Sequence, residues 1–136
     1  MKKTNNKGFS LIELIIVIAI MAILVAIIAP NLTKYLGKSK KNTDTKNLDE
    51  IESTLKTCIT DYEMDNGTLL SGSSTLTVTW DSSGIVSSGN TKFDDIVNEA
   101  IDSAKTKSKE DSSDYAKAVI SKSSSGGYSI AMSWAH

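Results

Sequence analysis

The stretch KGFSLIELIIVIAIMAILVAIIAP, from Lys7 to Pro30, decides how this chain is built. Residues 9–32 form a run of 24 residues with one charged side chain, Glu13. At roughly 1.5 Å per residue, a helix of this length is about 36 Å long and crosses a hydrocarbon core of about 30 Å. Apolar residues surround the helix on every side from Leu14 to Ala29. The segment therefore belongs in lipid or in the middle of a helical bundle.

Glu13 is the exceptional residue of this run. An ionised carboxylate inside a bilayer costs on the order of a few kcal/mol, and it usually marks function. Cutting the chain between Gly8 and Phe9 creates an ammonium group about 6 Å along the helix before Glu13, which is a suitable partner. The alternative is a lone charge near a helix end that reaches out to the membrane interface.

The N-terminal residues together resemble the class III signal of type IV prepilins. The shared features are the polar leader MKKTNNKG, Gly8 before the cut, Phe9 after it, Glu13 at the fifth position beyond it, and the long apolar run. The resemblance reaches from Lys7 to about Leu36. It implies that a prepilin peptidase must accept Gly8 and that Phe9 becomes N-methylated. It also implies that Glu13 pairs with the Phe9 amine of a neighbouring subunit and sets its register, and that Pro30 is a helix kink.

Length and charge favour one small domain behind the membrane segment. Residues 1–46 carry eight lysines and two acids, and the remaining residues carry seven lysines and fourteen acids. All basic residues are lysine, which disfavours any site that needs a bidentate guanidinium group. Cys58 is the single cysteine, so an intrachain disulfide is excluded. Many pilins of bacteria with a periplasm resemble one another in a disulfide-closed C-terminal loop, so its absence favours a Gram-positive source.

The rest of the chain predicts an α+β fold. Pro30 should bend or loosen the helix that begins at Phe9 and ends at about Met64. Its second half has one apolar stripe, formed by Leu48, Ile51, Leu55, Cys58, Ile59 and Tyr62. Thr75 to Trp80 alternates like a strand, and residues 85–87 suit a short return strand.

The C-terminal third predicts one short helix and a hairpin. Phe93 to Ala104 has helical periodicity, with Asp94 or Asp95 placed to cap its start. Residues 105–114 are expected to form a solvated loop, and residues 115–122 and 127–134 the two strands of a hairpin. We therefore expect a long helix, half membrane-spanning and half packed on a sheet of three or four antiparallel strands, with one inserted short helix.

Three domains follow from this organisation: a cleaved leader at residues 1–8, a transmembrane and filament-core helix at 9–32, and a soluble pilin domain at 33–136. A Sec signal peptide is disfavoured, because its apolar region is shorter and ends at a small-residue cleavage site. The lysine count on the two sides of the apolar run does not settle orientation. A cytoplasmic N-terminus is implied by the resemblance alone.

The remaining polar residues give no catalytic or cofactor site. His136 is the only histidine, so no Ser-His-Asp or Cys-His arrangement and no zinc cluster can be drawn, and we expect no enzyme. Glu110, Asp111 and Asp114 hint at calcium, but their spacing fits no known loop motif, and a solvated turn is the favoured interpretation. The lysines Lys34, Lys38, Lys40 and Lys41 suit lipid headgroups; binding of nucleic acid is possible but unsupported.

The resemblance implies the principal subunit of a type IV pilus. Such a chain is anchored in the cytoplasmic membrane, cleaved after Gly8 and polymerised into an extracellular filament that serves adhesion, motility or DNA uptake. The partners are then other pilin subunits, the prepilin peptidase, and a membrane assembly platform with its ATPase. Two alternatives stay open: a pseudopilin of a type II secretion or competence system, and a membrane-tethered binding domain that never polymerises.

Overall fold

The computed structural model describes residues 8–136, so residues 1–7 of the predicted leader lie outside the described part. The chain divides into two compact units, Met1–Lys38 and Ser39–His136. The elements are, in chain order, α1 (Leu11–Asn66), β1 (Thr75–Trp80), β2 (Val86–Ser87), α2 (Thr91–Ala100), the short 3-10 helix η1 (Ser103–Lys105), β3 (Tyr115–Lys122) and β4 (Tyr128–Ala135). The predicted α+β class is confirmed.

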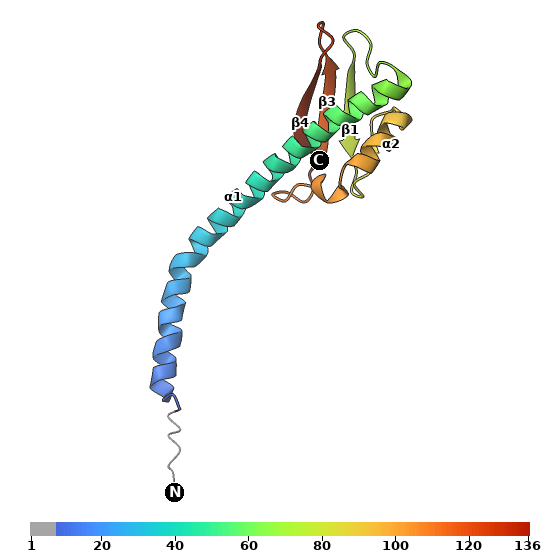
Figure 1. Ribbon diagram of the computed structural model, residues 1–136. Helices are drawn as coiled ribbons and strands as arrows, with labels where there is room; N and C mark the ends of the chain where they lie inside the picture. Colours follow the sequence, from blue (N-terminus) through green and yellow to red (C-terminus); the bar gives the residue numbers. More distant parts are fainter. Residues whose placement is uncertain (1–7) are drawn as a thin grey trace. The chain divides into compact units, whose positions relative to one another are not determined.

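The second half of α1 lies across the sheet (Figure 1), and its apolar stripe is part of the hydrophobic core. Ile51, Leu55, Cys58 and Ile59 are buried, as their three- and four-residue spacing predicts, and Leu48 and Tyr62 pack half-buried at the edges of the stripe. On the outer side, Glu52 and Lys56 form the expected ion pair one turn apart, at 3.0 Å. The hydrophobic core of the globular unit therefore lies between this stripe and one face of the sheet.

The bounds of α1 differ from the prediction at both ends. The helix begins at Leu11, because Phe9 and Ser10 are not helical, and it ends at Asn66 instead of Met64. Gly67 follows with a φ of 82° and donates its N–H to the Glu63 carbonyl. A glycine in this left-handed conformation is a common C-terminal stop, because it satisfies a helix carbonyl without a Cβ clash.

The sheet has the strand order β2-β1-β3-β4, and all neighbouring strands are antiparallel. Val78 pairs with Ala118, and Ala118 pairs with Met132, so one row of side chains faces the core across three strands. Successive side chains of a strand point to opposite faces, which leaves Thr77 and Thr79 of β1 on the exposed face. The predicted strand at Thr75–Trp80 and the C-terminal hairpin are confirmed.

The short helix α2 differs from its prediction in both cap and length. Its N-cap is Asn90, whose side chain accepts the N–H of Phe93, and it ends at Ala100 because Ile101 is extended. Asp94 lies inside the first turn and accepts instead from the hydroxyl of Ser88 at 2.5 Å. The prediction of Asp94 or Asp95 as the N-cap was therefore wrong, and the helix begins about one turn earlier. Asparagine is as good an N-cap as aspartate, so the sequence offered both positions. Phe93 and Val97 bury the helix against the core.

Gly84 supports our first prediction. Its φ is 75°, and a Cβ at this position would overlap the Ser103 Cβ and lie 2.9 Å from the Ser103 Cα. Gly84→Ala should therefore lower the free energy of unfolding by about 3 kcal/mol, through backbone strain and overpacking together. Gly89→Ala is the matched control, because Gly89 has a φ of 85° and open space around it. Urea unfolding, followed by the fluorescence of buried Trp80, measures both; equal losses in the two variants would contradict the packing argument.

Candidate functional site: the N-terminal segment and the loop that docks on Asp44

The large apolar side chains between Phe9 and Leu32 are all exposed, with fractions from 48% at Val17 to 86% at Phe9. By length and composition, α1 contains a segment able to cross a membrane, and none of that segment is buried within the protein. Exposed apolar area of this extent is unfavourable in water at about 25 cal/mol per Å². The segment therefore needs lipid or another protein chain around it.

Glu13 forms a reciprocal capping box with Ser10 at the start of α1. The Ser10 N–H donates to the Glu13 Oε2 at 3.1 Å, and the Glu13 N–H donates to the Ser10 Oγ at 3.4 Å. Each side chain thus satisfies a backbone donor at the helix start. The sequence carries a signal for this cap that the predicted helix start at Phe9 missed, because Ser-x-x-Glu before an apolar run is its usual form. Gly8 and Phe9 precede the cap, and both are exposed and outside the helix.

Pro30 lies inside α1, and the helix continues through it. The Thr33 hydroxyl donates to the Ala29 carbonyl at 3.0 Å, one turn back. The kink at Pro30 stays a prediction. Just beyond it, a shallow groove is lined by Asn31, Lys34, Tyr35 and Lys38, whose spacing of three and four residues places them on one helix face.

The loop before β3 docks on Asp44 of α1, which is 3% exposed. The Asp44 carboxylate accepts the Ser108 hydroxyl at 2.5 Å, the Lys109 N–H at 2.6 Å and the Glu110 N–H at 3.0 Å. Burial raises the pKa of Asp44, but these three donors outweigh it and leave the pKa below its ordinary value. The carboxylate therefore stays charged and holds the loop.

This docking corrects the prediction of a solvated loop over residues 105–114 at two positions, whereas Lys107 and residues 109–113 are exposed as expected. Thr106 and Ser108 are buried, and Lys107 forms an isolated bridge with Tyr115. Composition indicated solvent exposure because the segment is polar throughout. The buried partner, Asp44, lies 64 residues away from Ser108 in the sequence, so no local pattern could reveal it.

Two further polar contacts tie α1 to the rest of the globular unit. Lys105 of η1 pairs with Glu50, and this pairing lowers the pKa of Glu50 and raises that of Lys105. Tyr128 of β4 donates its hydroxyl to Glu63 of α1, and that hydrogen bond lowers the pKa of Glu63. These contacts fix loop and strand to the helix surface, and none resembles a catalytic arrangement.

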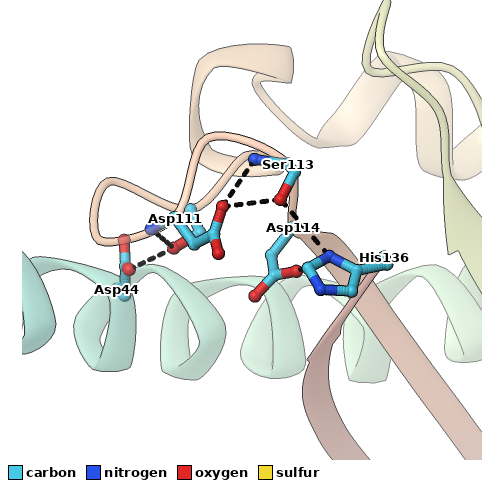
Figure 2. A network of polar contacts seen from close by, with 6 residues as sticks. Asp44, Asp111, Ser113, Asp114 and His136 are labelled. Atoms are coloured by element: carbon cyan, nitrogen blue, oxygen red, sulfur yellow. Dashed lines mark hydrogen bonds and ion pairs between the residues drawn. The ribbon is translucent and has the colours of Figure 1, made fainter.

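Of the three acids considered as calcium ligands, Asp111 and Asp114 lie close together in the structure, and His136 lies beside them. Ligand atoms of Asp111, Asp114 and His136 lie within 4.8 Å of one another, whereas Glu110 is not part of this group (Figure 2). His136 Nδ1 forms an ion pair with Asp114 and lies 3.3 Å from the Ser113 hydroxyl. Cys58 is 1% exposed, as expected for a core residue.

Comparison with known proteins concerns the N-terminal part of the chain. Residues 3–29 match the family model described as the prokaryotic N-terminal methylation motif. The type IV major fimbrial protein FimA of Dichelobacter nodosus is 37% identical over 59 residues, which are 43% of this chain and 38% of that protein. No solved structure matches the chain.

Two further relatives extend the picture. The prepilin peptidase-dependent protein A of Clostridium perfringens is 40% identical over 55 residues, covering 40% of this chain and 39% of that protein. The competence protein ComGC of Bacillus subtilis is 36% identical over 62 residues, covering 46% of this chain and 59% of that protein. The chain thus spans between about two fifths and three fifths of the length of these three relatives. In its N-terminal part, through the methylation motif and the apolar run that follows it, the chain is therefore similar to type IV pilins and to related prepilin-type proteins.

Proposed function

We propose that this chain is the principal structural subunit of a type IV pilus. Residues 1–8 form a leader that is removed, residues 9–32 anchor the prepilin in the cytoplasmic membrane with the N-terminus inside, and residues 33–136 form the soluble domain. After cleavage, the same helix packs into the core of an extracellular filament. The prepilin peptidase, an assembly platform and its ATPase are the partners that this cycle requires.

The observation that carries the proposal is the exposed apolar helix with a single acid close to its start. Lipid tails are as apolar as leucine side chains, so moving the helix from lipid to neighbouring helices changes little hydrophobic free energy. Packing between subunits and the one charged pair must then select the arrangement. A head-to-tail contact that does not close generates an open helical filament.

Glu13 has a different role in each state of this cycle. In the uncleaved chain its carboxylate caps α1 together with Ser10. Cleavage after Gly8 creates the Phe9 amine, which we propose is then N-methylated and retains its positive charge. A neighbouring subunit's Glu13 pairs with that amine, and among apolar helices such a pair specifies register more than it adds stability.

Gly8→Val tests the cleavage step. A Cβ added at Gly8 meets nothing within 4 Å, and Gly8 lies outside α1, so we expect the fold to be unaffected and any effect to report on the peptidase. We expect mass spectrometry of membranes to find residues 1–8 still attached, and electron microscopy to find no filaments. Gly8→Ala is the control, because its single methyl group should obstruct cleavage less than the valine side chain does. Filaments built from Gly8→Val subunits with an intact leader would contradict the proposal.

The proposal as a whole is tested on filaments sheared from cells. Electron microscopy of cells with and without this chain, combined with mass spectrometry of the fibres, should show filaments that depend on the chain and contain a peptide beginning at a methylated Phe9. Fibres that lack the chain would refute the structural role. A functional chain that retains residues 1–8 would instead support the membrane-tethered binding domain.

A competence pseudopilin is the second candidate, and one observation favours it. The similarity to the competence protein of Bacillus subtilis covers 59% of that protein, a larger share than for the fimbrial relative. The two functions differ in what deletion removes. A pilus subunit leaves cells without long surface filaments, whereas a competence pseudopilin leaves cells that no longer take up DNA while long filaments persist.

A further inference from the structure

The hairpin register brings His136 to the loop that precedes β3. Tyr115 pairs with Ala135 at the end of the β3–β4 ladder, so the next residue on each side, Asp114 and His136, must lie close together. Asp111 approaches from the same loop, and Figure 2 shows its carboxylate beside the pair formed by Asp114 and His136. Three side chains with metal-binding atoms thus meet at the end of the hairpin.

Hydrogen bonds hold the first of these carboxylates in place. The Asp111 Oδ1 accepts the Ser113 N–H at 2.9 Å and the Ser113 hydroxyl at 2.6 Å, and these bonds leave the Oδ2 available. The Asp111 N–H donates to the Ser108 Oγ at 3.0 Å, and the Ser108 hydroxyl donates to buried Asp44. The loop is therefore anchored on α1, and ligand side chains supported in this way bind metals more tightly.

We propose that Asp111, Asp114 and His136 bind a divalent transition-metal ion of the Zn²⁺ type. One imidazole nitrogen and two carboxylate oxygens are ordinary zinc ligands, and water completes the coordination. Calcium is disfavoured, because it takes six to eight oxygen ligands and an imidazole nitrogen is not among its preferred donors. The His136 side chain is 75% exposed, so the ion reaches it directly from water.

This site differs from the zinc clusters that the sequence excluded. A lone histidine rules out sites built from several Cys and His ligands, but not a site in which carboxylates supply the other donors. Cys58 does not compete for the ion, because burial raises the pKa of its thiol to about 11 and the thiol stays protonated in the core. The bound ion would join the end of β4 to the loop that Asp44 holds.

The test is a zinc chloride titration of the full-length chain in detergent micelles, by calorimetry and by thermal unfolding. We expect one ion per chain and a melting temperature that rises with zinc, because an ion that binds only the folded state stabilises it. His136→Lys places a cation beside Asp114 and removes the imidazole ligand, and should weaken zinc binding at least about tenfold. His136→Cys replaces the imidazole with a thiol, which is also a zinc ligand, and should retain binding.

The acids have their own variants. Asp114→Asn should weaken zinc binding at least about tenfold, whereas Asp95→Asn removes the same charge from an exposed position on α2 and should change nothing. The proposal is overturned if the wild-type chain shows no saturable zinc binding, or if His136→Lys binds zinc as tightly as the wild type. Equal losses in Asp114→Asn and Asp95→Asn would also overturn it, because they indicate attraction of the ion to overall negative charge.

Discussion

Glu13→Gln should abolish filament assembly and leave membrane insertion intact. Glutamine keeps the capping box with Ser10, since its side-chain oxygen accepts the same N–H, so α1 still begins at the same residue. Only the charge is lost, and with it the partner of the proposed Phe9 amine. Removing one member of a buried charge pair costs about 3–5 kcal/mol, which weakens subunit association at least about a hundredfold. Electron microscopy and shearing yield measure the filaments, and membrane fractionation measures insertion.

Ser10→Ala is the matched control for this experiment. It removes the hydroxyl that accepts the Glu13 N–H and costs the helix start about 1 kcal/mol, but it leaves the Glu13 carboxylate in place. We expect Ser10→Ala subunits to assemble. The opposite pattern, with filaments from Glu13→Gln and none from Ser10→Ala, would show that Glu13 acts only as a helix cap and that register is set elsewhere.

The elements that the sequence predicted well are those whose signal is local. Three elements can be recognised from the spacing of apolar residues within the segment itself: the apolar run, the stripe around Leu55 and the alternating segment Thr75–Trp80. The hairpin of β3 and β4 is also local, because its strands are joined by a short polar turn in which the Ser123 N–H donates to the Gly127 carbonyl at 2.7 Å. The first and last residues of the helices were predicted less accurately, because several nearby residues can act as the N-cap. At the start of α2, Asn90 caps the helix where Asp94 was predicted.

The features that escaped prediction depend on contacts between distant residues. Strand β1 pairs with β3, so that Val78 lies opposite Ala118, although α2 separates the two strands in the sequence. The periodicity of neither strand specifies this pairing. The approach of His136 to Asp114 depends on the exact register of the hairpin, which follows only once both strand bounds are known. Local patterns therefore located the helix and its acid, whereas the polar network at the end of the sheet had to be seen in three dimensions.

Replacing Asp44 should have a large effect on the stability of the globular unit, comparable with that of Gly84→Ala. Its carboxylate is the common acceptor for three donors of the loop before β3, from Ser108, Lys109 and Glu110. Asp44→Ala leaves these donors without their charged acceptor, and a hydrogen bond to a charged group contributes about 1.5–3 kcal/mol. We expect the free energy of unfolding to fall by about 3 kcal/mol, measured by urea unfolding of the full-length chain in micelles. Asp49→Asn, on the exposed side of the same helix, should have almost no effect.

Asp44→Asn and the pH dependence distinguish a held carboxylate from a merely well-packed side chain. The D44N side chain has nearly the same shape but turns an amide donor toward donors of the loop, so this variant should lose almost as much stability as Asp44→Ala. Because the pKa of Asp44 is lowered from 3.8 in the folded state, its contribution is present above that value and is lost as the pH falls through the lower folded pKa. The difference between wild type and D44N should thus be constant near neutral pH and shrink below about pH 4. A difference that stays the same down to about pH 2 would mean that packing, and not the charge, holds the loop on α1.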